Sequence, residues 1–384
     1  MEAVNIQEIL IVNGIGVLLM LLLRATWIGG VKQRQIGDRL YDAMIKITLA
    51  GCILETVTFL IDGVQFPGCR AVSYVTNGLL FMGTITVGFL WCMYVDFQQN
   101  NSPRRLRATA WFLLLPVVIV YALSLSSMLG SGMMFSISQD NVYHRGPFAT
   151  SSYVLLFFYY AYSLYLTTRK RRCGLQIQFF PVLYFIIPCV LGTVIQGIWY
   201  GITAGWTSVA ISMVLVHMQL QSMNAYMDSL SGLYNRRYLD YVLSHRRKQG
   251  SRYIYGIYID VNDFKGINDR YGHSAGDEAI RAIGRILSDS IPNCGAAIRC
   301  AGDEFMVLLP TGKEDYTRQV MALIQQNADR CSGEHPFPIS LAMGCSRFDT
   351  VEGSVEEFLS QMDQQMYRSK AEYYKQQNND RRKP

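Results

Sequence analysis

Long apolar runs separated by short polar stretches fill the first 222 residues of the chain. A membrane-spanning helix needs about 20 mostly apolar residues. The first run lacks the basic leader and small-residue cleavage site of a secretory signal, so we expect it to remain as an anchor. The pattern predicts an α-helical seven-span membrane domain over residues 1–212, its last span reaching residue 222. The predicted spans are residues 7–23, 43–62, 74–95, 108–129, 152–168, 178–199 and 205–222.

The periodicity changes in the second part of the chain, where short apolar strands alternate with amphipathic helices. Ile280, Ile283, Leu287 and Ile291 recur at helical spacing, so they form one apolar face. Strands interleaved with helices predict a sheet covered by helices. We expect the polar tail, residues 376–384, to be disordered. The predicted elements are strands at 253–261, 296–299, 305–309 and 337–345, and helices at 276–291, 315–331 and 354–374.

A connector of residues 213–230 joins these two parts, and no proline or glycine interrupts the chain between Trp206 and Gly232. Apolar residues in it alternate at spacings of three and four, which is the pattern of a two-helix coiled coil. The alternative is that its first half faces lipid and its second half packs on the domain that follows. The predicted seam comprises Met213, Val216, Leu220, Met223, Met227 and Leu230.

Positive charge predicts the orientation of the spans. The loops after spans one, three and five carry twelve lysines and arginines when Lys46, in the first turn of span two, is counted with them, whereas the loops after spans two, four and six carry two. Cytoplasmic loops hold the excess of positive charge, so we expect the N-terminus outside and all residues after 222 in the cytoplasm. The net charge of +6 forms no basic stripe with interleaved aromatic residues, and we expect no nucleic-acid binding.

Two adjacent carboxylates, Asp303 and Glu304, follow Gly302 in a predicted tight turn between two apolar strands. Carboxylates at a strand end suit a hard divalent cation such as Mg²⁺. Gly302 would let the backbone approach a bulky group such as a phosphate. For this turn taken alone, a solvated hairpin tip is the alternative.

Three further polar segments widen this picture: Asp228–Arg237, Ile257–Asp277 and Asp363–Lys370. With Ala301–Phe305, and in this order and spacing, they resemble the GGDEF family of diguanylate cyclases. The resemblance covers residues 223–375 and does not extend to residues 1–222. It implies an α/β domain whose central, mainly antiparallel sheet is flanked by helices, similar to the palm of nucleotidyl cyclases and polymerases.

The resemblance also implies an activity. Such an enzyme is a nucleotidyltransferase that condenses two GTP into cyclic di-GMP and two pyrophosphates. One site holds one GTP and the product is two-fold symmetric, so a homodimer is implied. The whole chain would then be a multi-pass protein of the bacterial cytoplasmic membrane, in contact with the lipid bilayer. Its downstream cyclic di-GMP receptors are not identified by the sequence.

The family's functional residues carry over position by position. The resemblance implies that Glu304, Asp303 and Lys265 act in catalysis. It implies that a metal site of Asp260, Val261, Asp303 and Glu304 takes Mg²⁺, with Mn²⁺ as an alternative. Asn268 and Asp277 match the pair that reads guanine. The implied phosphate-binding residues are Asp263, Phe264, Gly302 and Lys370.

The chain departs from the family pattern at several positions. Ala301 replaces the first glycine of the family signature. This replacement is harmless if the φ of Ala301 is negative, and it costs about 1 kcal/mol of backbone strain if that φ is positive. Asn262 stands where many relatives carry a second Asp, and Ser369 and Tyr374 predict a weaker grip on phosphate. Residues 292–295 lack the Arg and Asp of the family's product-inhibition site, so we expect none here.

Two alternatives remain open. The domain could be a catalytically inactive module that binds GTP or a dinucleotide and acts through partners, as Ala301 and Tyr374 favour. The membrane part could be a transporter with an accessory domain, but that class needs several buried charges and only Glu55 is evident. An intramembrane carboxylate is a functional-site candidate. Its alternative role is a hydrogen bond between helices.

Overall fold

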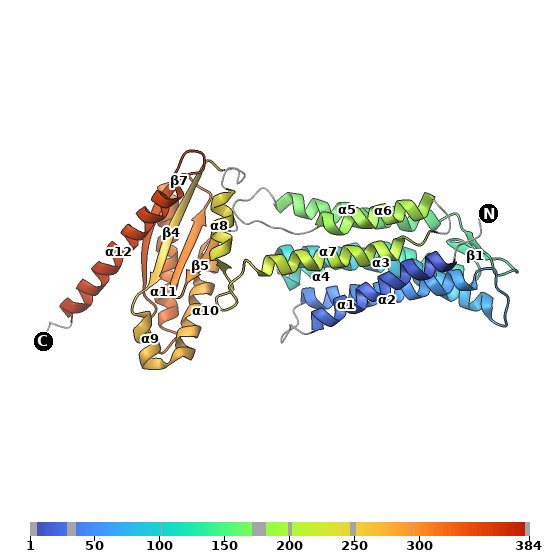
Figure 1. Ribbon diagram of the computed structural model, residues 1–384, viewed down its shortest axis with the longest axis horizontal. Coiled ribbons are helices and arrows are strands. Elements are labelled where there is room, and N and C mark those ends of the chain that lie inside the picture. Colours follow the sequence, from blue (N-terminus) through green and yellow to red (C-terminus); the bar gives the residue numbers. More distant parts are fainter. Residues whose placement is uncertain are drawn as a thin grey trace. The chain divides into compact units, whose positions relative to one another are not determined.

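The computed structural model describes residues 6–28, 36–100, 102–170, 182–198, 202–245, 251–292 and 294–380 (Figure 1). The chain separates into two compact units, one built from the helices up to residue 220 and one from residue 221 onward. Each unit is described by itself. Several basic loop residues behind the predicted orientation, Lys32, Arg34, Arg171 and Arg172, lie outside the described residues.

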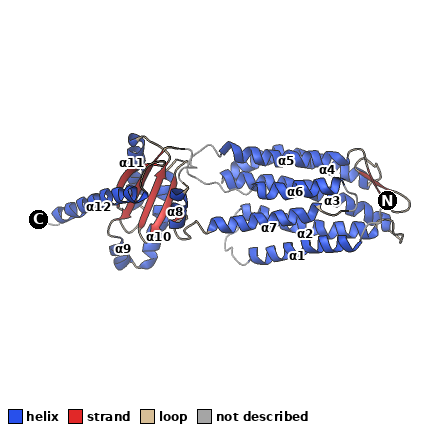
Figure 2. Ribbon diagram, turned by 45° about the horizontal axis from the view of Figure 1, so that its top comes forward, coloured by secondary structure: helices blue, strands red, loops and turns tan. Residues whose placement is uncertain are grey.

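The first unit is a bundle of helices that run side by side (Figures 1 and 2). Each predicted span overlaps one helix of the described chain. Four of these helices, α1 to α4, are long and apolar enough to cross a membrane. The short strands β1 (Phe135–Ile137) and β2 (Tyr143–Arg145) pair antiparallel between α4 and α5. The helices are α1 (Ile6–Ile28), α2 (Ile36–Ile61), α3 (Cys69–Asn100), α4 (Pro103–Met128), α5 (Ala149–Lys170), α6 (Val182–Ile198) and α7 (Gly205–Asn224).

Large aromatic side chains hold this bundle together. The rings of Trp91 in α3 and Phe185 in α6 stack with centroids 3.8 Å apart. The Tyr41 hydroxyl donates a hydrogen bond of 2.6 Å to the carbonyl of Met213, which joins α2 to α7. Gly51 must lack a side chain, because the Trp206 ring fills the space that its Cβ would take. The core therefore fixes α7 against the other helices.

The connector differs from the prediction. Helix α7 ends at Asn224, so the prediction of one helix through residue 230 is wrong. Beyond this end the chain turns back, and the Asn235 amide donates to the carbonyls of Ala225 and Met227, at 2.8 and 3.2 Å. Two of the predicted seam residues, Met213 and Val216, are fully buried within the bundle itself. They are not available to a second copy of the chain.

The second unit contains a five-stranded sheet with strand order β3-β5-β6-β4-β7. All neighbouring strands pair antiparallel except β3 and β5, which are parallel. The prediction of a mainly antiparallel α/β domain is therefore confirmed. The strands are β3 (Tyr234–Asn235), β4 (Tyr253–Val261), β5 (Ala296–Ala301), β6 (Glu304–Leu309) and β7 (Leu341–Asp349).

Helices pack around this sheet (Figure 2). Successive residues of β4 point to opposite faces. Ile257 and Ile259 face a core with α10 (His273–Ser290) and α11 (Glu314–Ser332). Ile254 and Tyr258 face a second core with α8 (Arg236–Ser244) and α12 (Val355–Asp380). Helix α9 (Phe264–Tyr271) follows β4 directly. The end of β4 is thus placed between two packed layers.

Two predicted elements shift. The strand predicted at 337–345 lies at 341–349, because β7 pairs with β4 over its whole length, from Tyr253↔Asp349 to Val261↔Leu341. Helix α12 continues to Asp380, so the expected disorder of the tail is wrong for residues 376–380. Residues 381–384 lie outside the described chain.

Candidate active site

The predicted carboxylates meet where β4 ends and the β5–β6 hairpin turns. Asp260 and Glu304 are direct partners in the antiparallel ladder, and such partners project from the same face of a sheet. Asp303 immediately precedes Glu304 in the turn. Asp260 is only 7% exposed, so its charge needs a partner. The structure therefore brings the three predicted acidic residues to one place.

That partner is Lys370 of α12. Its ammonium donates a 2.5 Å hydrogen bond to Asp260 Oδ1. Burial raises the pKa of Asp260 and outweighs the opposing effect of Lys370, and Asp303 adds to the rise. Burial lowers the pKa of Lys370, but the hydrogen bond and charge of Asp260 outweigh it and raise that pKa overall. Sequence reasoning gave Lys370 a phosphate as its partner, whereas here it balances a predicted metal ligand.

Tyr258 orients the neighbouring carboxylate, and sequence reasoning missed it. Its hydroxyl donates a 3.1 Å hydrogen bond to Glu304 Oε2. Burial, followed by the charges of Cys300 and Glu304, raises the pKa of Tyr258, so it remains a donor at neutral pH. The available signal was position: Tyr258 lies two residues before Asp260 in a strand and therefore on the same face.

The hairpin turn shows why the Ala301 replacement is tolerated. Gly302 has φ of 43°, in the region that favours glycine. Among the described non-glycine residues, positive φ occurs at Asn141 and Asp263, so Ala301 has negative φ. The strain considered for Ala301 is absent. The Arg299 side chain further fixes the turn by donating from Nε to the Gly302 carbonyl at 2.9 Å.

Arg299 also explains the Asp228 segment. Its Nη1 lies 3.0 Å from Asp228 Oδ1, and that oxygen also accepts hydrogen bonds from the Ser231 N–H and hydroxyl, at 2.8 and 2.7 Å. Burial alone would raise the pKa of Asp228, but Ser231 and Arg299 outweigh it and lower the pKa. The Asp228 segment therefore stabilises the β5–β6 hairpin through Arg299, without contributing a residue to the proposed reaction. Sequence reasoning missed the role of Arg299.

The start of α9 offers backbone donors. Asp263 precedes the helix with φ of 53°, and its carbonyl accepts the Ile267 N–H at 3.1 Å. The N–H groups of Phe264, Lys265 and Gly266 come before that first helical bond and have no partner inside the helix. Lys265 is exposed and makes no ion pair within the described chain. A helix start with a free lysine is suited to phosphate.

The two predicted guanine-reading residues lie on neighbouring helices. Asn268 in α9 packs against Gly276 in α10 so closely that a Cβ at Gly276 would overlap the Asn268 amide. Asp277 is the next residue of α10, and its carboxylate is 56% exposed with Arg281 3.9 Å away. The contact at Gly276 therefore brings an amide and an accessible carboxylate to adjacent positions.

A divalent cation fits this site in one specific way. Over the described residues, no three His, Cys, Asp or Glu side chains are grouped closely enough to hold a metal ion alone. Small divalent cations are usually held by one or two carboxylates together with substrate phosphates. The oxygen-rich set of Asp260, Asp303 and Glu304 therefore suits a cation that binds together with a nucleotide. Asn262 is buried and donates to Ser340 Oγ at 2.9 Å.

The membrane candidate, Glu55, lies in the other unit. It is 3% exposed, and its Oε1 accepts a 2.9 Å hydrogen bond from Gln196 Nε2. This bond joins α2 to α6, as the alternative reading of Glu55 proposed. It satisfies only one of the two carboxylate oxygens, because Oε2 is buried without a hydrogen-bond partner in the described chain.

Comparisons with known proteins find similarity in the second unit. Residues 225–376 match the family model described as diguanylate cyclase, GGDEF domain. Diguanylate cyclase DgcS of Shewanella oneidensis is 33% identical over 159 residues, which are 40% of this chain and 52% of the relative. Diguanylate cyclase VdcA of Vibrio cholerae is 34% identical over 157 residues, which are 38% of this chain and 44% of the relative. The chain thus matches about half the length of these curated relatives.

A solved structure is also similar. It is the crystal structure of the coiled coil and GGDEF domain of DgcB from Caulobacter crescentus in complex with c-di-GMP. It covers 43% of this chain and 91% of its own, at 22% identity and a TM-score of 0.38.

Proposed function

We propose that this protein, whose residues 225–376 match the family model of the GGDEF domain of diguanylate cyclases, condenses two GTP into cyclic di-GMP and two pyrophosphates. The observation that carries the proposal is the pairing of Asp260 with Glu304 across β4 and β6, with Asp303 adjacent in the turn. Three carboxylates at the end of a buried strand raise the free energy of the folded state, because burial and mutual repulsion disfavour their charges. A cation or a proton bound between them would offset this cost.

The proposed reaction is a phosphoryl transfer in which a ribose 3′-hydroxyl attacks an α-phosphate and pyrophosphate leaves. Asp260, Asp303 and the Val261 carbonyl would hold Mg²⁺, with Mn²⁺ as a substitute. Such a cation polarises the α-phosphate and balances its developing charge. Glu304, fixed by the Tyr258 hydroxyl, accepts the proton of the attacking hydroxyl. The proton thus moves from the ribose oxygen to a Glu304 carboxylate oxygen as the new P–O bond forms.

Phosphate binding falls to the start of α9 and to two lysines. The N–H groups of Phe264 and Lys265 cradle the β- and γ-phosphates together with the Lys265 ammonium. Gly302 lets the hairpin turn approach the nucleotide. Lys370 balances Asp260 in the nucleotide-free site. When a cation binds the Asp260 carboxylate, the Lys370 ammonium would be released to bind a phosphate.

Guanine selection is assigned to Asn268 and Asp277. A carboxylate that accepts hydrogen bonds from guanine N1–H and N2–H₂ would be left unpaired by adenine, which offers no matching donors. An unpaired partner of this kind gives strong discrimination between substrates. The exposed Asp277 carboxylate is accessible for this role.

The whole-chain proposal is a homodimer held in the bacterial cytoplasmic membrane by seven spans. Three of these, over α5, α6 and α7, go beyond the four helices that length and composition support. The N-terminus would lie outside and the cyclase domain in the cytoplasm, where GTP is available. The excess of basic residues in alternate loops supports this orientation. Residues 292–295 carry no Arg or Asp, so we propose no product inhibition through them.

A second candidate function is nucleotide binding without turnover, with signalling through partners. The observation that favours it is the tight pairing of Lys370 with Asp260, which occupies a proposed metal ligand. The two functions differ in whether GTP is consumed.

The test uses the full-length protein in lipid nanodiscs with GTP and Mg²⁺, and measures cyclic dinucleotide and pyrophosphate. Asp303→Ala should lower product formation by at least about a hundredfold, because it removes charge that acts on the reacting phosphate. Asp289→Ala, an exposed carboxylate of α10 outside the site, is the matched control and should be unchanged. Equal activity of Asp303→Ala and wild type would refute the assignment of the site. Nucleotide binding without product in wild type would favour the second function.

A further inference from the structure

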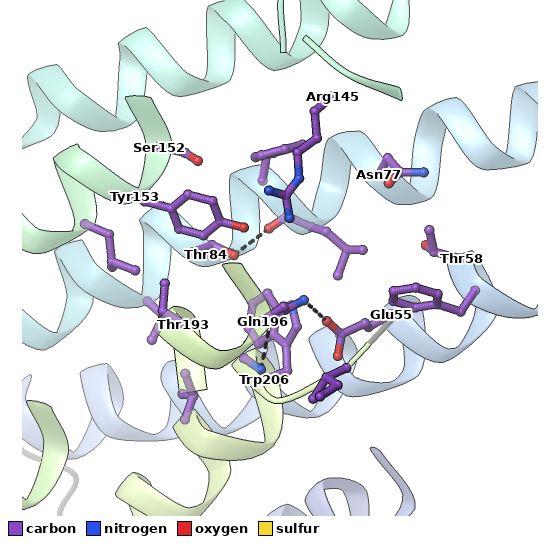
Figure 3. A pocket seen from close by; sticks show the side chains of 18 of the residues that line it. Glu55, Thr58, Asn77, Thr84, Arg145, Ser152, Tyr153, Thr193, Gln196 and Trp206 are labelled. Atoms are coloured by element: carbon purple, nitrogen blue, oxygen red, sulfur yellow. Dashed lines mark hydrogen bonds between the residues drawn. The ribbon is translucent and has the colours of Figure 1, made fainter. Parts of the chain in front are cut away.

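A cavity of about 160 Å³ lies inside the helical bundle of the first unit. Its walls combine the apolar side chains of Phe81, Leu156 and Trp206 with polar groups from several helices. Figure 3 shows Glu55, Tyr153 and Arg145 pointing toward the same space from different elements. A dry cavity of about 150 Å³ can hold a molecule the size of benzene. The space is therefore adequate for a ligand of about six to nine non-hydrogen atoms.

The cavity contains an unsatisfied acidic group. Glu55 is 97% buried, and Gln196 satisfies only its Oε1. Its Oε2 has no hydrogen-bond partner in the described chain. The Asn13 side chain also interacts with this carboxylate, but its Nδ2 and Glu55 Oε2 do not meet the distance and angle of a hydrogen bond. A donor or a cation stabilises a buried carboxylate in an apolar bundle, so this wall is complementary to an ammonium group.

A basic group lines the same cavity. Arg145 ends β2 and reaches the cavity from the hairpin side. Within the described residues Arg145 makes no ion pair, neither with Glu55 nor with Asp62, which also lines the cavity. The Asp62 carboxylate instead accepts the Tyr143 N–H at 2.9 Å. A guanidinium in this position is complementary to a carboxylate, which it can bind through two parallel hydrogen bonds.

The cavity lies at one end of the bundle. Its lining comes from the last turns of α2 and α6, the part of α3 from Asn77 to Val87, the first half of α5, the start of α7 and strand β2. The last turns of α2 and α6, the start of α7 and strand β2 are on the outer side in the proposed orientation, and Val87 and Tyr160 carry the cavity to the middle of their predicted spans. Only the side of ligand entry rests on the proposed membrane orientation, because the binding contacts are all within the bundle.

We infer that this cavity binds a small zwitterion, with its ammonium group on Glu55 and its carboxylate on Arg145, between aromatic walls. An amino acid of about six to nine non-hydrogen atoms has this chemistry and size. Trp206, which packs against Gly51 and lines the cavity, would contact the apolar part of the ligand. The site thus gives the membrane unit an input of its own.

The experiment measures binding to the full-length protein in lipid nanodiscs without nucleotide. The probes are the L-amino acids from alanine to leucine in size, each compared with the amine and the carboxylic acid that bear the same side chain. The readouts are the shift in unfolding temperature, which rises with occupancy, and tryptophan fluorescence. At least one amino acid should bind at least about tenfold more tightly than both of its singly charged analogues, because each analogue leaves one charged wall unpaired.

Two variants locate the contacts. Glu55→Gln and Arg145→Gln should each weaken amino-acid binding by at least about tenfold. Arg70→Gln and Asp140→Asn, which change charges on the same side of the bundle outside the cavity, are the matched controls and should bind normally. If Glu55→Gln does not fold, the comparison of zwitterions with their analogues on the wild-type protein still decides the question.

The proposal is overturned if no amino acid binds up to about 10 mM, if an amine alone binds as tightly as its amino acid, or if both variants bind normally. Because no GTP is present, a negative result leaves the proposed cyclase activity standing. Failure of GTP turnover, in the same way, leaves this site untouched.

Discussion

Tyr258 tests whether the Glu304 carboxylate is held in a fixed position in the proposed active site. Its hydroxyl fixes Glu304 through one hydrogen bond. Tyr258→Phe keeps the packing and removes the bond, which is worth about 1 kcal/mol. We expect kcat to fall about five- to tenfold with little change in KM for GTP, measured by pyrophosphate release. Tyr255→Phe, on the opposite face of the same strand, is the matched control. An unchanged kcat in Tyr258→Phe would show that Glu304 is held by other contacts.

Asp228 predicts a dependence of stability on pH. Its pKa in the folded protein is lowered, because Ser231 and Arg299 outweigh the raising effect of burial. The pKa of Asp in an unfolded chain is about 3.9. A folded pKa below that value means that Asp228 stabilises the fold fully above about pH 4. The contribution is lost as the pH falls through the lower, folded pKa.

Asp228→Asn should therefore destabilise the protein at pH 7 by about 2 kcal/mol, since it replaces a charged acceptor of three hydrogen bonds. The difference from wild type should shrink below about pH 4. Thermal unfolding of the full-length protein at several pH values measures this, with Asp289→Asn as control. A difference that stays constant down to pH 3 would contradict the role of the Asp228 charge.

Sequence reasoning at this scale succeeded where chemistry and spacing coincide. Asp260 and Glu304, two of the predicted site residues, lie opposite each other because strand pairing places them so, and Asp303 precedes Glu304 in the turn. Tyr258 and Arg299 were missed because their roles are hydrogen bonds to other side chains or to a turn carbonyl. Such partners depend on register and rotamer, which a pattern of apolar and polar residues does not specify.

At the scale of elements, the contact between α9 and α10 depends on Gly276. A side chain there would displace the Asn268 amide. We expect Gly276→Ala to raise KM for GTP at least about tenfold, because it moves one member of the guanine-reading pair. Stability should change little, since alanine favours a helix interior more than glycine does. Gly333→Ala, at a glycine of ordinary φ where a Cβ would make only an ordinary contact with the Arg330 carbonyl, is the control. An unchanged KM in Gly276→Ala would remove Asn268 from substrate binding.

Helices were predicted better than their ends. The apolar period of each helix is local, so the positions of α10 and α11 follow from the sequence. The turn that follows α7 involves Asn235, eleven residues beyond the end of that helix, whose amide donates to two carbonyls. The extent of β7 depends on its partner β4. Elements whose limits are set by distant partners were therefore the ones misplaced.

At the scale of the whole molecule, we propose two sites of different chemistry. The second unit gathers carboxylates and backbone donors for a nucleotide. The first unit encloses a cavity with one acidic and one basic side. The predicted coiled-coil seam loses two of its residues, because Met213 and Val216 are part of the core of the helical bundle. The homodimer is part of the proposed function.

The measurement that tests the central claim most directly is the fate of GTP on the wild-type protein. Full-length protein in nanodiscs is incubated with Mg²⁺ and GTP labelled at the α-phosphate, and the products are identified by mass and counted. The account predicts cyclic di-GMP with two pyrophosphates released for each molecule formed, and no product when Mg²⁺ is removed by a chelator. Bound GTP recovered unchanged, from protein that remains folded and binds a non-hydrolysable GTP analogue, would contradict it.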